Sequence, residues 1–432
     1  MKPLPGALIA ELQRCVSAPV LTSDLEVAPY GRDFGGVRRA RPVAVVRSRA
    51  EEETRAVLRL LRRERVPVTI RGGGFSFDGQ SLGRSVVLVN QPHAASSARV
   101  TGLTVEVPAR MRWAALVDQL KLHLQMPPVL TYALQTSVGG TLSAGGYGAS
   151  SVAGGAQVDH VRRLRLILPD GDARWCSPTE DADLFRFALG GMGRVGVIER
   201  VEMTTAPYRP LVRLVTREHR DAAGLLREID ALDAPDYFFA ELVGGAIRSH
   251  RGYNVSAAEL FALGAGEVVS PVHFTPATAE PAPDRLAHLW CDYFVDRRRL
   301  EPFLAFVERG LRDGDLAGGL DRVHILAIGP APAAGLRAFP PTPSCATARY
   351  YGVGLFYSAS EDDAQRIGAV RAAQRALLDE CLRLGGRPYL CGAHALDEET
   401  IGAIYGDAHG ELDRLRDRLD PDRLFNRLQH GL

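Results

Sequence analysis

The sequence lacks the long apolar run that a membrane-spanning helix requires, because no stretch of its 432 residues approaches roughly 18 uninterrupted apolar residues. It also lacks an excess of charge of either sign, since 52 lysines and arginines stand against 51 aspartates and glutamates. The net charge of +1 gives no reason to expect a nucleic acid or an anionic membrane as a partner. We find no internal repeat.

Cysteine is scarce, and the pattern of its six positions excludes the usual metal sites. The residues at 15, 176, 291, 345, 381 and 391 do not have the spacing of metal ligands. In a chain of this size they are expected to be reduced, mostly buried thiols. The N-terminus, which Pro3, Pro5 and Glu11 interrupt, makes a poor signal peptide. We therefore expect a cytoplasmic protein without a metal site.

Glycine is abundant, and its most informative cluster lies in the segment Arg71-Gly72-Gly73-Gly74-Phe75-Ser76-Phe77-Asp78-Gly79-Gln80. Apolar and polar residues alternate from Val66 to Ile70, which predicts a strand before the cluster. Glycines that adopt positive φ angles leave their N–H groups free, and such groups can form an anion-binding concavity. Ser76 would add a hydroxyl and Arg71 a charge. A tight turn between strands explains these ten residues equally well, and the segment is neither a P-loop nor a Rossmann fingerprint.

Two further glycine clusters favour the ligand-binding interpretation. One extends over residues 135–148 and contains Val138-Gly139-Gly140-Thr141-Leu142-Ser143. The other is Gly190-Gly191-Met192-Gly193-Arg194-Val195-Gly196-Val197-Ile198. Three such loops in one half of a chain indicate a long, extended ligand.

The three loops resemble those of the FAD-linked oxidases of the vanillyl-alcohol-oxidase superfamily, which have a PCMH-type FAD-binding domain. Their counterparts are a Gly-Arg-Gly-His-Ser loop, a Val-Gly-Gly-Thr-Leu-Ser segment and a Gly-Gly-x-Gly-x-x-Gly-Val-Ile segment. Within the superfamily the chain is most similar to the cytokinin dehydrogenases, because segments at 236–241, 289–300, 389–390 and 420–429 resemble theirs. The resemblance extends from about residue 40 to the end.

The resemblance implies an α+β fold of two domains. It predicts a PCMH-type FAD-binding domain over residues 1–206 and a substrate domain over 207–385. Residues 386–432 would return to the FAD-binding domain. The substrate domain is expected to be an antiparallel sheet that is covered by helices and lies over the flavin.

Local patterns predict individual elements within this division. Ser48-Arg49-Ala50-Glu51 has the form of a capping box that opens a helix toward Arg63. An Arg-rich helix with a solvated face is predicted over 361–384. Further runs predict strands at 86–89, 104–107, 164–168 and 197–203 and a helix at 113–124.

The cofactor implied by the resemblance is FAD, and two positions predict that it binds noncovalently. The histidine that carries the flavin in the family is Phe75 here, and Gln135 stands where some relatives have a second linking cysteine. The residues implied to hold FAD are Arg71, Gly72, Gly73, Gly74, Phe75, Ser76, Gln80, Ser137, Gly139, Gly140, Thr141, Ser143, Tyr147, Gly196, Ile198, Tyr389, Asn426 and Gln429.

The catalytic residues are harder to carry over. The family's proton-accepting aspartate corresponds to Tyr132, whose phenol, with an ordinary pKa near ~10, is a weak base that can instead donate a hydrogen bond. By the same count the expected substrate-domain glutamate falls on Arg285. The neighbouring Asp284 substitutes for it only if the loop shifts by one residue, and a solvated Pro-rich loop explains Asp284 at least as well.

Two other residues are candidates. Glu241 follows an aromatic run in which burial would raise its pKa, but a strand glutamate with a backbone partner is the simpler interpretation. His394 matches a family histidine only across a two-residue insertion, so an active-site base and a loop histidine are equally good interpretations.

These observations predict an FAD-dependent oxidoreductase that takes hydride from a C–N or C–O bond of a small organic substrate, which would lie near Tyr132 and Tyr389. The expected electron acceptor is O2 or another oxidant, with no nucleic acid or membrane partner. An oxidase or epimerase acting on a sugar alcohol or a biosynthetic intermediate is the alternative enzyme. A flavin-fold binding protein that has lost catalysis is the alternative of another class.

Overall fold

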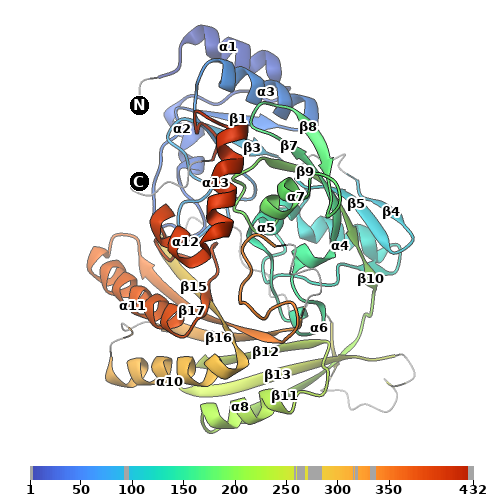
Figure 1. Cartoon of the computed structure of the whole chain (residues 1–432), viewed down its shortest axis with the longest axis vertical. Helices are drawn as coiled ribbons and strands as arrows, with labels where there is room; N and C mark the ends of the chain where they lie inside the picture. Colours follow the sequence, from blue (N-terminus) through green and yellow to red (C-terminus); the bar gives the residue numbers. More distant parts are fainter. Residues whose placement is uncertain are drawn as a thin grey trace.

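A computed structural model describes residues 3–91, 97–256, 259, 268–270, 285–314, 316, 320–330 and 337–426. Figure 1 shows two halves, one above the other. The chain builds the upper half first, crosses to the lower half after β10 (Ala206–Pro207), and returns at its end to the upper half.

The upper half contains two main sheets. A parallel sheet has the order β1-β3-β2, and an antiparallel sheet has the order β4-β5-β9-β7-β8. The apolar runs in the parallel strands are buried, as is typical of strands that are covered on both faces. The strands are β1 (Ala44–Ser48), β2 (Val68–Arg71), β3 (Val86–Asn90), β4 (Arg99–Thr101), β5 (Thr104–Pro108), β6 (Gln125–Met126), β7 (Val161–Ile167), β8 (Ala173–Cys176) and β9 (Val197–Thr204).

Helices and short turns surround these sheets. In chain order they are α1 (Gly6–Cys15), α2 (Asp24–Val27), η1 (Ala28–Gly31), α3 (Glu51–Arg63), α4 (Trp113–Lys121), α5 (Val138–Ala144), α6 (Ser151–Gly154), η2 (Gln157–His160) and α7 (Ala182–Ala188). The strands and helices predicted from residue patterns in this half therefore occur with small changes of boundary.

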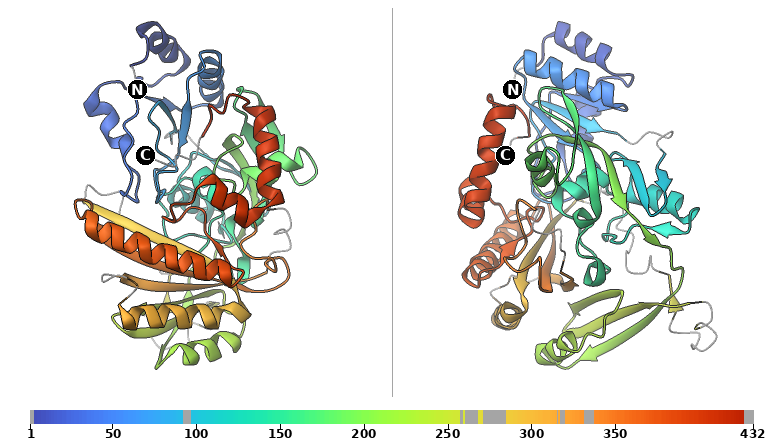
Figure 2. Two further views of the ribbon diagram at one scale, coloured as in Figure 1. Left: turned by 60° about the vertical axis from the view of Figure 1, so that its left-hand side comes forward. Right: turned by 45° about the vertical axis from the view of Figure 1, so that its right-hand side comes forward.

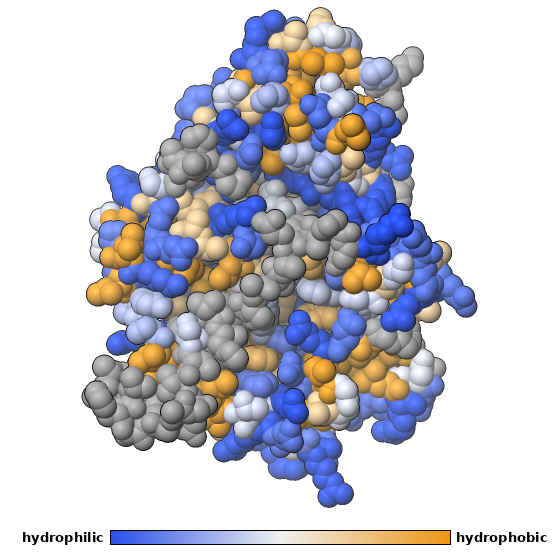
Figure 3. Space-filling model, turned by 180° about the vertical axis from the view of Figure 1, so that it is seen from behind, coloured by the Kyte–Doolittle hydropathy of each residue, from blue (hydrophilic) through white to orange (hydrophobic). Residues whose placement is uncertain are grey.

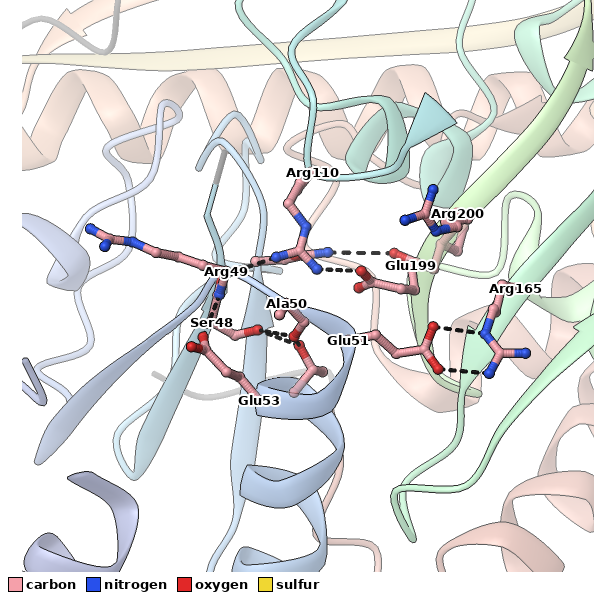
Figure 4. A network of polar contacts seen from close by, with 12 residues as sticks. Ser48, Arg49, Ala50, Glu51, Glu53, Arg110, Arg165, Glu199 and Arg200 are labelled. Atoms are coloured by element: carbon pink, nitrogen blue, oxygen red, sulfur yellow. Dashed lines mark hydrogen bonds and ion pairs between the residues drawn. The ribbon is translucent and has the colours of Figure 1, made fainter. Parts of the chain in front are cut away.

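The capping box predicted at the start of α3 is wrong. The N-cap is Ala50, and the Ser48 hydroxyl instead contacts Thr54 and the Ala50 carbonyl. The Glu51 carboxylate accepts two hydrogen bonds of 2.7 Å from Arg165 of β7, as Figure 4 shows. Glu51, which the capping box would have used, therefore pairs with an arginine of another element instead.

The lower half is an eight-stranded sheet with the order β14-β11-β13-β12-β16-β17-β15-β18, and every pairing in it is antiparallel. Three long helices run along one face of it (Figures 1 and 2). The strands are β11 (Val212–His219), β12 (Tyr237–Val243), β13 (Ala246–Asn254), β14 (Val268–Val269), β15 (Leu286–Asp296), β16 (Leu320–Ile328), β17 (Tyr350–Ser360) and β18 (Arg387–Pro388), and the helices are α8 (Ala222–Asp230), α10 (Arg297–Asp313) and α11 (Ala364–Arg383).

Side-chain alternation along β15 assigns the two faces of this sheet. The odd-numbered residues from Ala287 to Val295 are buried in the core under the helices. Tyr293, for example, donates a 3.0 Å hydrogen bond to the Gln374 carbonyl of α11. The even-numbered residues Trp290, Asp292 and Phe294 lie on the opposite face, which is turned toward the upper half.

The last described segment returns to the upper half. It forms α12 (Glu398–Tyr405) and α13 (Asp407–Leu419), and Arg186 of α7 pairs with Glu411 of α13. Phe425 then forms a parallel bridge with Val68 of β2. The division into domains over 1–206, 207–385 and 386–432 stays a prediction.

The outer surface is of mixed character. Figure 3 shows hydrophilic residues interspersed with smaller hydrophobic groups on the face seen from behind. Among the helices of the described residues, none has both the length and the hydropathy needed to cross a bilayer. All six cysteines are free thiols, and within the same residues no group of side chains has the composition of a metal site.

Candidate active site

A cavity of about 460 Å³ lies between the glycine loops of the upper half and the open face of the sheet. It brings together residues from all three loops and from the end of the chain. The predicted cofactor residues that line it are Gly72, Gly73, Gly74, Phe75, Ser76, Gln80, Ser137, Gly139, Gly140, Thr141, Ser143, Tyr147, Gly196, Ile198, Tyr389 and Asn426. Gln429 lies outside the described residues.

The first loop is held in place by Asp33, which the sequence gave no reason to single out. One Asp33 oxygen accepts 2.8 Å hydrogen bonds from the Ser76 hydroxyl and the Gly79 amide, and the other accepts from the Gly36 amide. Burial raises the pKa of Asp33 to about 6, although these hydrogen bonds oppose the shift. The loop conformation thus depends on a buried carboxyl some forty residues earlier in the chain.

Arg71 does not line the cavity, and the prediction that it adds charge there is wrong. Its guanidinium lies behind the loop and donates a 2.9 Å hydrogen bond to the Arg32 carbonyl. Gly74 has φ +77°, and a Cβ at that position would lie 2.3 Å from this guanidinium. Arg71 therefore supports the loop from beneath and requires glycine at position 74.

The second and third loops approach each other closely at α5. Ser137 caps this helix by accepting a hydrogen bond from the Gly140 amide. A Cβ on Gly139 would lie 3.0 Å from the Ala109 side chain, and one on Gly196 would lie 2.6 Å from the Ile167 carbonyl. Glycine is needed at both positions because neighbouring elements leave no room for a side chain.

Asn426 joins the end of the chain to two of the loops. Its side chain accepts a 2.6 Å hydrogen bond from the Ile70 amide and donates a 2.7 Å hydrogen bond to the Gly193 carbonyl. The predicted placement of Asn426 beside the cavity agrees with this geometry.

A buried ion pair occupies another part of the cavity wall. Arg110, which lines the cavity, pairs with Glu199 near the start of β9, and Figure 4 shows the two side chains facing each other. Burial raises the pKa of Glu199, while Arg110 opposes that shift. The charge of Arg110 is therefore already balanced within the protein.

Three rows of side chains form the floor of the cavity on the sheet. Each row crosses from β15 through β17 to β16, as the strand registers fix. The rows are Trp290–Phe356–Arg322, Asp292–Gly354–His324 and Phe294–Gly352–Leu326. Aromatic and apolar side chains thus flank a central row that carries a carboxyl and an imidazole.

Gly354 makes room for the Asp292 carboxyl in the central row. A Cβ on Gly354 would lie 2.5 Å from an Asp292 oxygen and 3.0 Å from the Phe356 ring. The carboxyl faces the cavity, and burial raises its pKa to about 7. A carboxyl with this pKa exchanges a proton near neutral pH, which suits a general base.

Tyr132 also lines the cavity, and its hydroxyl lies 2.6 Å from Nε2 of His324. Burial raises the pKa of Tyr132 above its usual value and lowers the pKa of His324 to about 3. Both groups are consequently neutral at ordinary pH. His324 therefore brings no positive charge that would activate the phenol as a base.

Two other candidate catalytic residues, Glu241 and His394, lie away from the cavity. Glu241 on β12 lies opposite His324 and so extends the central row, but it does not line the cavity. Its Oε1 atom lies 3.7 Å from Nε2 of His250. His394 is buried against the Tyr293 ring and does not line the cavity either. Asp284 lies outside the described residues.

Phe75 belongs to an aromatic wall of the cavity. Its ring stacks on Phe34 at 5.7 Å between ring centroids, and Phe34 stacks in turn on His288 at 4.6 Å. Beside them the rings of Phe77 and Trp290 pack on each other, with 5.3 Å between their centroids. The position of the family's linking histidine is filled by part of this apolar cluster.

Asp292, His324 and Arg322 were missed by reasoning from the sequence. A signal for Asp292 was present, because Trp290, Asp292 and Phe294 alternate with buried residues in a segment that resembles the family. His324 and Arg322 also alternate along β16, but no motif marks them. Their proximity to Asp292 depends on pairing between strands about thirty residues or more apart.

Comparison with known proteins identifies the cofactor. Residues 42–177 match the FAD binding domain family. The chain is an FAD-dependent oxidoreductase. An enzyme of this kind uses a small-molecule substrate and an oxidant that accepts the electrons.

Similar proteins agree with this assignment. The oxidoreductase is 27% identical over 434 residues to an uncharacterized oxidoreductase, ORF5 of the fasciation locus of Rhodococcoides fascians, and the match covers 94% of this chain and 97% of that protein. It is 30% identical over 237 residues to cytokinin dehydrogenase 7 of Oryza sativa subsp. japonica, which covers 53% of this chain and 45% of the rice protein. The resemblance to cytokinin dehydrogenases is thereby confirmed.

Two solved structures share the fold of this oxidoreductase. The structure of FgChi7B has a TM-score of 0.79 at 16% identity, with 98% of both chains covered. A chitooligosaccharide oxidase has a TM-score of 0.77 at 14% identity, with 97% of both chains covered. At such identities the likeness shows the fold alone.

The residues of the cavity fit FAD. The backbone at Gly72, Gly139 and Gly196 lines the cavity. A Cβ at any of these three positions would collide with a neighbouring residue. Asn90 and Thr131 line the cavity with a buried oxygen that has no hydrogen-bond partner within the described residues. An extended polar cofactor would satisfy such groups, and the glycine loops can hold its pyrophosphate.

Proposed function

We propose that this FAD-dependent oxidoreductase oxidises a C–N or C–O bond next to an unsaturated group in a small organic substrate, with Asp292 as the proton acceptor. The observation that carries the proposal is the Asp292 carboxyl on the cavity floor, whose pKa burial raises to about 7. FAD, when bound, supplies the two-electron acceptor for the hydride that leaves the substrate carbon. Asp292 takes the proton from the nitrogen or oxygen bonded to that carbon.

The surroundings of Tyr132 favour a supporting role for it. A phenol whose pKa is raised by burial does not accept a proton at neutral pH. Tyr132 can instead orient the substrate by a hydrogen bond, while His324 holds its hydroxyl at 2.6 Å. Glycine at position 354 leaves room for the Asp292 carboxyl beside the Phe356 ring.

The cofactor in this proposal is noncovalent, because Phe75 has no nucleophilic atom to bond to the flavin. Acid precipitation of the purified yellow protein tests the point. The flavin is expected to remain in the supernatant, and yellow colour in the pellet would contradict noncovalent binding.

A panel of electron donors tests the reaction. The holoenzyme is mixed without oxygen with allylic and benzylic amines and alcohols, including isoprenoid adenines, and the flavin absorbance is followed. Bleaching by at least one such donor is expected. A holoenzyme that no donor bleaches, but that dithionite reduces, would support the binding-protein alternative. The physiological oxidant, O2 or another acceptor, then follows from which compound restores the colour.

A further inference from the structure

Arg322 presents an unbalanced positive charge to the substrate side of the cavity. It lies on β16 at the end of the row Trp290–Phe356–Arg322, with its guanidinium carbon 5.1 Å from the centroid of the Phe356 ring. Within the described part of the chain its side chain makes no ion pair and no hydrogen bond. This differs from Arg110 on the opposite wall, which Glu199 neutralises.

The nearest cavity carboxyl does not balance this charge. Burial is the one cause that raises the pKa of Asp292, and no arginine opposes it. The two residues are on β15 and β16, with β17 between them. They also stand in neighbouring rows, two residues apart along the strands. Two strand spacings and this offset place their backbones roughly 12 Å apart, a span that can hold a small aromatic molecule.

The groups around Arg322 suit an anion. Its charge lowers the pKa of the nearby Tyr132 phenol, although burial raises that pKa more strongly. Neutral His324 can donate from Nε2 to the phenol oxygen, and the phenol proton is then available to an oxyanion. A guanidinium together with a phenol is a good donor set for a carboxylate or a phosphate.

The space between Arg322 and Asp292 is apolar. Phe356 lies beside the guanidinium, Trp290 follows at 4.8 Å from the Phe356 ring, and Phe77 packs on Trp290. An apolar or aromatic body fits against these rings. The three features together describe a molecule with an anionic end, an apolar middle and an oxidisable bond.

We propose that Arg322 selects anionic substrates. The carboxylate or phosphate of the substrate binds the Arg322 guanidinium, its apolar body lies against Phe356 and Trp290, and the carbon to be oxidised lies toward Asp292. This assignment rests on the proposed function of the same site, and it concerns binding rather than the chemical step.

Binding of simple probes to the holoenzyme tests the assignment without turnover. Benzoate, phenyl phosphate and uncharged benzamide are titrated separately while the flavin absorbance or the heat of binding is recorded. At least one of the two anions is expected to bind about tenfold or more tightly than benzamide, because a charged hydrogen-bonded pair is worth that much in a partly buried site. The tighter anion identifies carboxylate or phosphate as the preferred group.

Three variants locate the preference. Arg322→Met is expected to abolish the difference between anion and amide, and Arg322→Lys to keep part of it. Arg375→Met, which removes an equal charge from the exposed face of α11, is the matched control and should bind like wild type.

Benzamide binding as tightly as both anions, or an Arg322→Met enzyme that keeps the preference, would overturn the assignment. Failure of both anions to bind the wild-type holoenzyme would do so too, and this result does not require that any variant folds. Because the probes are not oxidised, the result is independent of the donor panel: a flavin that no donor bleaches contradicts the proposed function, whereas missing anion preference contradicts the role of Arg322.

Discussion

At the scale of single residues, the neighbours of a titratable group decide its role more than its position in a motif. Tyr132 occupies the place of the family's aspartate, but burial keeps its phenol neutral and its partner His324 is neutral as well. Asp292 has no counterpart among the expected catalytic residues, yet burial alone brings its pKa to about 7. Proton acceptance therefore belongs to Asp292 in our account.

Removal of the Tyr132 hydroxyl is expected to weaken substrate binding more than chemistry. Tyr132→Phe should raise KM and lower the rate of flavin reduction by about tenfold or less, since one neutral hydrogen bond is lost. Stopped-flow reduction at several donor concentrations separates the two effects. Tyr253→Phe, at the outer part of the sheet, is the control.

Two results would contradict this role. A rate loss of more than about a hundredfold would make Tyr132 part of the proton transfer. Unchanged kinetics would mean that it has no role in the reaction.

At the scale of elements, the first glycine loop depends on a carboxyl from outside it. Asp33→Asn would turn an amide N–H₂ either toward the Ser76 hydroxyl and the Gly79 amide or toward the Gly36 amide, which now donate to the two carboxyl oxygens. We expect an FAD dissociation constant about tenfold higher and a loss of about 1–3 kcal/mol in the free energy of unfolding. Fluorescence of released flavin and chemical denaturation measure these effects.

The exposed residue Asp24 provides the control for this prediction, because its side chain is open to solvent. Asp24→Asn should bind FAD as wild type does. If Asp33→Asn also binds FAD with unchanged affinity, the loop does not need the carboxyl.

Strand β17 is shaped by glycine, and a single methyl group should disturb it. Gly354→Ala would place a Cβ 2.5 Å from Asp292 and 3.0 Å from Phe356, so we expect destabilisation by about 1–3 kcal/mol and a large loss of flavin reduction. Gly368→Ala is the matched control on α11, where a Cβ meets nothing within 4 Å.

In the interior of an exposed helix the control change should stabilise by about 0.5–1 kcal/mol. Thermal unfolding of the two variants provides the comparison. Equal stability of both variants would show that the Gly354 site is not close-packed.

At the scale of the whole molecule, the site exists because the glycine loops of the upper half face the open side of the lower sheet. The glycine loops were predictable from the sequence, since a run such as Gly72–Gly74 is typical of few structures and three such runs lie in one half of the chain. Most of the strands and helices were predictable from alternation and periodicity as well. These features are local, so the residues that cause them are adjacent in the chain.

The parts that could not be predicted depend on distant contacts. Arg71 carries a charge beside an anion-binding loop, yet its direction is decided by the Arg32 carbonyl. The predicted Ser48 capping box does not form, because the Glu51 carboxylate accepts a hydrogen bond from Arg165 of β7 instead. The central row Asp292–Gly354–His324 becomes visible only when three strands are placed in register.

The pH dependence of flavin reduction tests the central claim most directly. Wild-type holoenzyme, Asp292→Asn and the exposed control Asp321→Asn are reduced without oxygen, in single turnover, with a donor that bleaches the flavin. The Asp292 carboxylate is the active form. The wild-type and Asp321→Asn rates should therefore rise as the pH passes through about 7, the pKa of Asp292, and then level off. Asp292→Asn should be slower by about a hundredfold or more and independent of pH in that range. An Asp292→Asn enzyme that keeps the wild-type rate and pH profile would contradict the account.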